Sequence, residues 1–148
     1  MITLNLGVFD IPRLEYVDGE VIDVEFPLMM GELADSLEKR YQIFSYFWQI
    51  HKNSISQELM NYISDDLFEQ KNGKDNNYQF SDEAFSYIKS KFVRFLEMKV
   101  MDHSGIKGIP TLASLIGINR RLKGSIGPPR PSFIDTAQYM ESFVAWVD

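Results

Sequence analysis

The stretch from Glu20 to His51, EVIDVEFPLMMGELADSLEKRYQIFSYFWQIH, changes its hydrophobic period near Glu32. Before that point apolar and polar residues alternate, which is typical of a half-buried strand. After it, apolar residues recur at steps of three and four, which predicts a helix with one face toward a core. The stretch therefore predicts a fold that mixes strands and helices.

Further strand signals lie at both ends of the chain. Residues 2–8 alternate between apolar and polar, and residues 143–147 are rich in residues that favour strands, so we expect the last strand to return to the N-terminal sheet. Between them, Asp18-Gly19 is a pair that suits the tight turn of a hairpin. The residues of this hairpin that we expect to point inward are Ile22, Val24 and Phe26.

Three main helices are predicted. The first covers residues 32–51, a break follows at Lys52-Asn53-Ser54, and the second covers residues 55–70. Ser81 is the expected N-cap of the third. The apolar stripes of the first two are Leu33, Leu37, Tyr41, Phe44, Phe47, Trp48 and Ile50, then Ile55, Leu59, Ile63 and Leu67. The stripe of the third is Phe85, Ile88, Phe92 and Phe95 or Leu96. The prediction is an α+β fold in a single domain, residues 1–148, with a small antiparallel or mixed sheet, made of the N-terminal strand, the hairpin and the C-terminal strand, against three helices.

Composition excludes several classes of protein. The chain has 148 residues, 45% of them hydrophobic and 14% aromatic, which is enough for one globular core. No apolar run approaches the roughly 20 residues that a membrane span requires. The chain has no cysteine, so disulfides and thiolate metal sites are excluded. The N-terminus has no basic region before an apolar one, so we expect no signal peptide and residence in a cytoplasm.

The charge is unevenly distributed. The formal net charge is −6, yet residues 103–134 contain no Asp or Glu and are rich in Gly and Pro. The basic residues of this segment are Lys107, Arg120, Arg121, Lys123 and Arg130. Such a segment suits contact with a phosphate backbone or an acidic protein surface, and the alternative is an ordinary solvated helix end. We predict an interaction loop, with a shape set by what it touches.

No catalytic, cofactor-binding or metal-binding site is predicted. The two histidines, His51 and His103, have no metal-ligand spacing around them. Asp102, His103 and Ser104 are the residue types of a hydrolase triad, but consecutive residues cannot align as orienter, base and nucleophile.

The predicted last strand is apolar on both faces. Phe143 and Trp146 point to opposite sides of a strand, so one face needs cover beyond a two-layer core. Both are therefore candidate interaction residues.

The stretch from Arg130 to Asp148, RPSFIDTAQYMESFVAWVD, resembles the closing motif of the virion-morphogenesis proteins of tailed bacteriophages, the head-to-tail connector, tail-completion or neck family. The family pattern is a proline, then Asp-Thr-Gly, an apolar residue and a serine before a strand. The matching residues are Pro131, Asp135, Thr136, Tyr139 and Ser142. Ala137 stands where the family usually has Gly, a residue that often marks a positive φ.

The resemblance implies a small α+β subunit without catalysis or cofactor. It also implies a ring, a hexamer or dodecamer, between the portal complex and the tail tube of a virion assembled in a bacterial cytoplasm. The expected neighbours are portal or adaptor proteins and tail proteins. We expect the basic residues of segment 103–134 to lie at a subunit interface or to face DNA in the channel.

Three other functions remain open. The first is a tail terminator or baseplate component, which requires a similar interlocking subunit. The second is a small acidic cytoplasmic binding protein, such as an immunity protein or antitoxin, in a one-to-one complex with a basic partner. The third is a hydrolase with dispersed catalytic residues.

Overall fold

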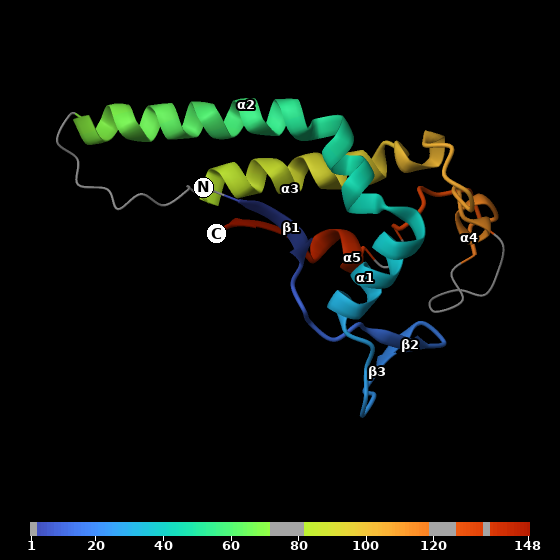
Figure 1. The fold of residues 1–148 in the computed structure, drawn as a ribbon. Helices are drawn as coiled ribbons and strands as arrows, with labels where there is room; N and C mark the ends of the chain where they lie inside the picture. The colour runs from blue at the N-terminus through green and yellow to red at the C-terminus, as the bar shows by residue number, and fades with distance from the viewer. Residues whose placement is uncertain (1–2, 72–81, 119–126, 135–136) are drawn as a thin grey trace.

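The computed structural model describes residues 3–71, 82–118, 127–134 and 137–148, and it has the predicted α+β fold (Figure 1). The strands are β1 (Leu4–Val8), β2 (Glu15–Val17), β3 (Glu20–Ile22) and β4 (Phe143–Val147). The helices are α1 (Met30–Tyr41), α2 (Ile43–Lys71), α3 (Asp82–Glu97), η1 (Met101–His103), α4 (Leu112–Leu115) and α5 (Gln138–Glu141). No helix among the described residues is both long enough and apolar enough to cross a bilayer.

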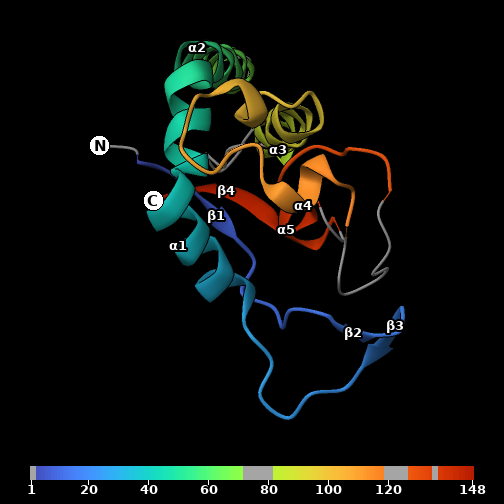
Figure 2. The ribbon, with the colours of Figure 1, turned by 90° about the vertical axis from the view of Figure 1, so that its right-hand side faces the viewer.

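The first and last strands form one antiparallel sheet, as predicted. Leu4 pairs with Val147 and Val8 pairs with Phe143, so β1 and β4 run side by side over their whole length (Figure 2). Alternation places Leu4, Leu6 and Val8 against the core from β1, and Phe143 and Ala145 from β4.

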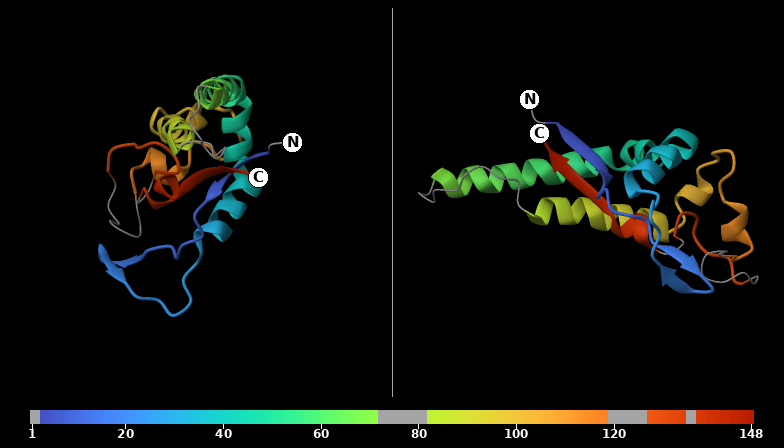
Figure 3. Two further views of the ribbon diagram at one scale, coloured as in Figure 1. Left: turned by 90° about the vertical axis from the view of Figure 1, so that its left-hand side faces the viewer. Right: turned by 90° about the horizontal axis from the view of Figure 1, so that it is seen from below.

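The hairpin forms a second, separate sheet and does not join the first. β2 pairs only with β3, and Asp18 and Gly19 make the turn with positive φ angles of 51° and 85°. The prediction that Ile22, Val24 and Phe26 point inward is wrong for Phe26, which is 85% exposed, and for Ile22, which is 41% exposed, whereas Val24 is half-buried. Alternation fails here because β3 ends at Ile22, and the chain beyond it projects from the body (Figure 3).

The first two helices meet at Gln42, ten residues before the predicted break. Gln42 has a left-handed φ of 53°, and the Glu38 carboxylate accepts hydrogen bonds from the backbone N–H groups of Phe44 (2.7 Å) and Ser45 (3.1 Å). This carboxylate satisfies N–H groups that a new helix leaves without partners. The predicted capping residue, Ser54, instead lies within α2 and donates its hydroxyl to the His51 carbonyl at 2.9 Å.

An aromatic cluster fills the space between α2, α3 and β4. The rings of Phe92 and Phe143 stack at 4.2 Å, and Phe47 meets both edge-on. The predicted stripe of α3 is confirmed, since Ile88, Phe92, Phe95 and Leu96 are all buried. The predicted apolar stripes of the first two helices include residues that are not buried. Trp48, Ile50 and Leu67 are 37%, 44% and 54% exposed. The C-terminal end of α2 extends beyond α3 (Figure 1).

Candidate interaction surfaces

The structure describes two of the five basic residues predicted to make contacts. Lys107 is exposed, between η1 and α4, and Arg130 is half-buried beside α4. Arg120, Arg121 and Lys123 lie outside the described residues.

Arg130 has an internal role that its sequence position did not predict. Its guanidinium donates to the carbonyl of Ile134 at 2.9 Å and to that of Ile118 at 3.2 Å, and its backbone N–H donates to the Ser114 carbonyl at 2.9 Å. Bonds from a charged donor are among the stronger hydrogen bonds in proteins. Arg130 therefore fastens residues 127–134 to the end of α4.

Buried serines hold the same segment from the other side. The hydroxyls of Ser114 and Ser132 lie 3.0 Å apart, and the Thr111 backbone N–H donates to Ser132 Oγ at 3.1 Å. Thr111 also caps α4, because its hydroxyl oxygen accepts from the Ser114 N–H. The described residues 127–134 are thus held by α4 of the same chain, which is what this part of the loop touches.

The outer face of α4 is apolar and uncovered. Leu112 is 72% exposed and Leu115 is 51% exposed. We call Leu112, Leu115 and the nearby exposed Lys107 the α4 surface. It combines apolar side chains with a positive charge, in a segment that has no acidic residue.

The described residues of the predicted motif lie at the corner before β4. Tyr139 and Ser142 are buried, Pro131 is half-buried, and Asp135 and Thr136 lie outside the described residues. Ser142 donates its hydroxyl to the Tyr139 carbonyl, and its own carbonyl accepts from the Phe9 N–H, both at 2.8 Å. Burial, together with the charge of Glu38, raises the pKa of Tyr139.

Ala137, which stands where the predicted motif has glycine, has a backbone conformation that favours glycine. Its φ is 62° and its ψ is −10°, in the left-handed region. The alanine therefore accepts strain that a glycine at this position avoids.

Phe143 and Trp146 differ in what they offer a partner. Phe143 is fully buried in the aromatic cluster, so the prediction that it lies at an interaction surface is wrong. Trp146 faces outward from the sheet and is 41% exposed.

The most prominent surface, and one that the sequence analysis missed, is the hairpin arm, which we define as residues 9–29. It carries eight of the 17 large hydrophobic residues that are exposed in the described part of the chain. They are Phe9, Ile11, Leu14, Val17, Val21, Ile22, Phe26 and Leu28. Residues 9–29 also hold six acidic side chains and a single basic one, Arg13. A dense apolar patch with charged neighbours is typical of a protein interaction site.

The arm is attached firmly at its base. Gln138 of α5 accepts from the Leu14 N–H and donates to the Pro12 carbonyl, both at 2.9 Å. The Asp10 carboxylate accepts from the Gly31 N–H at 2.9 Å, where α1 begins. These bonds attach the base of the arm to α1 and α5.

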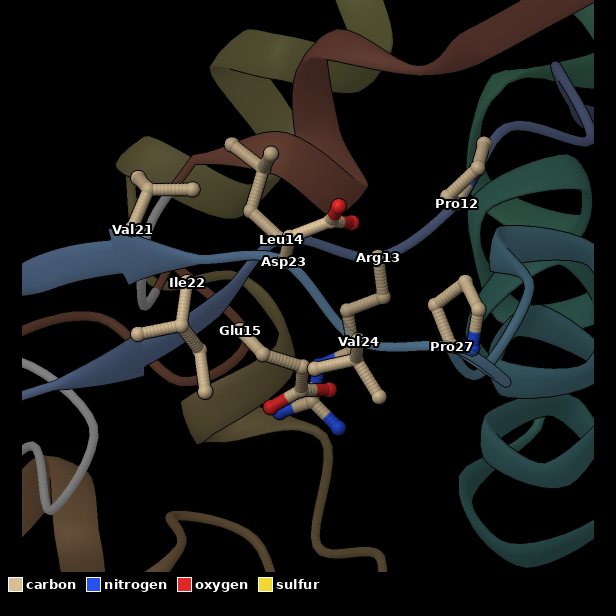
Figure 4. A pocket seen from close by; sticks show the side chains of 9 residues that line it. All are labelled: Pro12, Arg13, Leu14, Glu15, Val21, Ile22, Asp23, Val24 and Pro27. Carbon is tan, nitrogen blue, oxygen red and sulfur yellow. The ribbon is translucent and has the colours of Figure 1, made fainter.

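A pocket of about 370 Å³ opens where the two legs of the arm diverge (Figure 4). The legs pair at Glu15 with Ile22 and again at Pro12 with Met29. Between these pairs one leg has two residues and the other has six, so the longer leg bulges outward. The apolar lining residues include Leu14, Val21, Ile22 and Val24, and the acidic ones are Glu15 and Asp23. The sequence contains one sign of this bulge. More residues separate the Asp18-Gly19 turn from Pro27 than from Pro12, so the two legs of the hairpin differ in length.

The described residues contain no candidate metal site. No group of three or more His, Asp or Glu side chains among them lies close enough together to hold a metal ion. His51 packs against Phe47 and Phe95, and this burial, with the charge of Lys91, lowers its pKa.

No protein-family profile, curated protein or solved structure matches this chain. The likeness to phage proteins therefore rests on the residues of the 130–148 stretch.

Proposed function

We propose that this protein is a structural subunit of a tailed-phage virion, forming a ring in the head-to-tail connector that completes the tail or joins it to the portal complex. The observation that carries the proposal is the left-handed backbone of Ala137. It occurs at the one motif position where the family has glycine, within a corner that leads directly into the last strand. The short sequence likeness is thus accompanied by a backbone geometry that a glycine often marks.

Two unlike surfaces support assembly into a ring. The hairpin arm is apolar and acidic, whereas the α4 surface is apolar and basic. A ring needs a head-to-tail contact in which each subunit offers two different patches.

The test is to look for the polypeptide by mass spectrometry in purified particles from a lysate of the source that encodes it. A virion subunit is expected there at a few to a dozen copies per particle. A chain that is abundant in the soluble fraction and absent from particles contradicts the proposal.

A second experiment tests the basic segment. Arg120→Glu with Arg121→Glu is expected to block particle assembly while the isolated protein keeps the circular dichroism spectrum of the wild type. Glu58→Lys with Glu69→Lys, on α2, is the matched charge-reversal control and should leave assembly intact. Normal assembly of the arginine variant contradicts a role for these residues.

The acidic arm also favours a second candidate, the small binding protein with a basic partner. That function predicts a stable one-to-one complex and no chain in particles. Purification of the tagged protein from its source, followed by native mass spectrometry, distinguishes a single defined partner from a series of identical copies.

A further inference from the structure

The hairpin arm and the α4 surface are chemical complements. The arm joins exposed apolar side chains to six acidic residues and one basic one, and the α4 surface joins exposed Leu112 and Leu115 to the exposed Lys107, in a segment with no acidic residue. Opposite charge around matching apolar patches favours association and fixes its orientation.

The two surfaces do not cover each other within one copy. Leu112 remains 72% exposed and Val21, at the pocket, remains 57% exposed. Figures 1 and 2 place α4 and the β2–β3 hairpin apart. A second copy is thus free to cover both surfaces.

The pocket has the size and lining for a leucine. About 370 Å³ is more than one leucine side chain occupies, and Leu14, Val21, Ile22 and Val24 provide apolar walls. Glu15, Asp23 and Arg13 also line the pocket, so its lining holds two carboxylates and one guanidinium. Figure 4 shows the Arg13 side chain extending toward Glu15 and the Asp23 carboxylate on the opposite side of the legs, where a lysine that accompanies the leucine finds opposite charge.

We propose that the pocket of the hairpin arm receives Leu112 of a second copy of this chain, with Lys107 of that copy beside Asp23. The contact joins different surfaces on the two copies, so it repeats from subunit to subunit. The inference rests on the proposed function in that it identifies the contact that builds the ring.

Disulfide trapping tests the contact directly because the native chain has no cysteine. Val21→Cys and Leu112→Cys are made in separate chains, and both replace exposed side chains, so neither substitution disturbs the core. The two variants are mixed at high concentration and oxidised. The expected result is a mixed dimer that greatly exceeds the two homodimers. Its yield should fall several-fold in high salt and in a Lys107→Glu background.

The matched control pairs Val21→Cys with Ile50→Cys, which is on α2 and is 44% exposed. Equal cross-linking of the control and the test pair, or no mixed dimer at any concentration, overturns the inference. The double variant Val21→Cys/Leu112→Cys in one chain adds a second check. A ladder of dimers, trimers and higher species supports the contact between copies, and a disulfide confined to single chains overturns it.

The outcomes separate this inference from the proposed function. If particles contain the chain but particles built with the double variant give no ladder, the pocket contact is wrong and the virion role stands. If the purified protein gives the mixed dimer but particles lack the chain, the contact stands and the virion role is wrong.

Discussion

The indole ring of Trp146 lies over Gly7, across the sheet formed by β1 and β4. A Cβ atom at position 7 would lie 3.1 Å from both Cη2 and Cζ3 of the indole. Trp146 pairs with Asn5 in the strand register, so the ring reaches diagonally over the neighbouring strand. The outer face of this sheet is therefore covered in part by its own tryptophan, and the glycine provides the space.

A larger residue at position 7 should displace the indole. In a Trp48→Phe background Trp146 is the sole tryptophan. There, Gly7→Val is expected to shift tryptophan emission to longer wavelength and to lower the free energy of unfolding by about 1–2 kcal/mol, the usual cost of overpacking. Gly7→Ala, which adds one atom, should give a smaller shift. Unchanged emission in the valine variant would show that the ring does not rest on Gly7.

Glycine at position 137 should stabilise the protein. Ala137→Gly removes the strain of a left-handed alanine, so the free energy of unfolding is expected to rise by about 0.5–1 kcal/mol, after the greater entropy of the unfolded glycine is subtracted. Ala113→Gly, in the helical backbone of α4, is the control and should lower it by about 0.5–1 kcal/mol. Urea denaturation of both variants measures whether each substitution raises or lowers the free energy of unfolding. Destabilisation by Ala137→Gly would contradict the left-handed geometry.

Alanine should be poorly tolerated at Gly117. This glycine has a φ of 64°, and a Cβ there would lie 2.3 Å from the Pro128 carbonyl oxygen. Gly117→Ala must push residues 127–134 away from α4, with an expected loss of about 3 kcal/mol or more. Gly105→Ala is the matched control, since Gly105 has a φ of 75° but nothing within 4 Å of the added atom. Its expected loss is about 1–2 kcal/mol, from backbone strain alone. Equal losses in thermal or urea unfolding would contradict the close approach.

Acid should weaken the fold through His51. Its pKa in the folded chain is below the ordinary value of 6.5, because burial and the charge of Lys91 disfavour the imidazolium. The unfolded chain then binds more protons as the pH falls below about 6.5, so the free energy of unfolding decreases there. His51→Gln is expected to reduce this decrease, and Lys91→Gln should reduce it to a smaller extent. The measurement is urea unfolding at a series of pH values between about 7 and 5. An identical pH slope in His51→Gln and the wild type would contradict the assignment.

The sequence predicted the elements that local patterns control. The third helix and the last strand carry a clear period, and the Asp18-Gly19 turn has the residues that its φ angles require. The break between the first two helices was misplaced because Glu38 caps α2 from the preceding helix, and no local signal at Gln42 exceeded the Lys52-Asn53-Ser54 pattern. A side-chain capping bond between consecutive helices decided a boundary that propensity placed elsewhere.

The candidate surfaces were predicted less well. Basic charge identified the 103–134 segment, but charge alone did not reveal that Arg130 binds its own chain. The hairpin arm was missed because alternating residues predict a buried face whether or not a body lies beneath it. Phe26 is exposed because six residues of one leg face two of the other, a mismatch that only the register of the pairs reveals.

Two hydrogen bonds between Gln138 and the arm join two parts of the chain that are distant in sequence. Gln138 follows Ala137 directly, and its amide holds Pro12 and Leu14 from more than a hundred positions away. A change in the backbone of residue 137 is therefore expected to shift Pro12 and Leu14, and with them the base of the arm, without altering any residue of the arm itself.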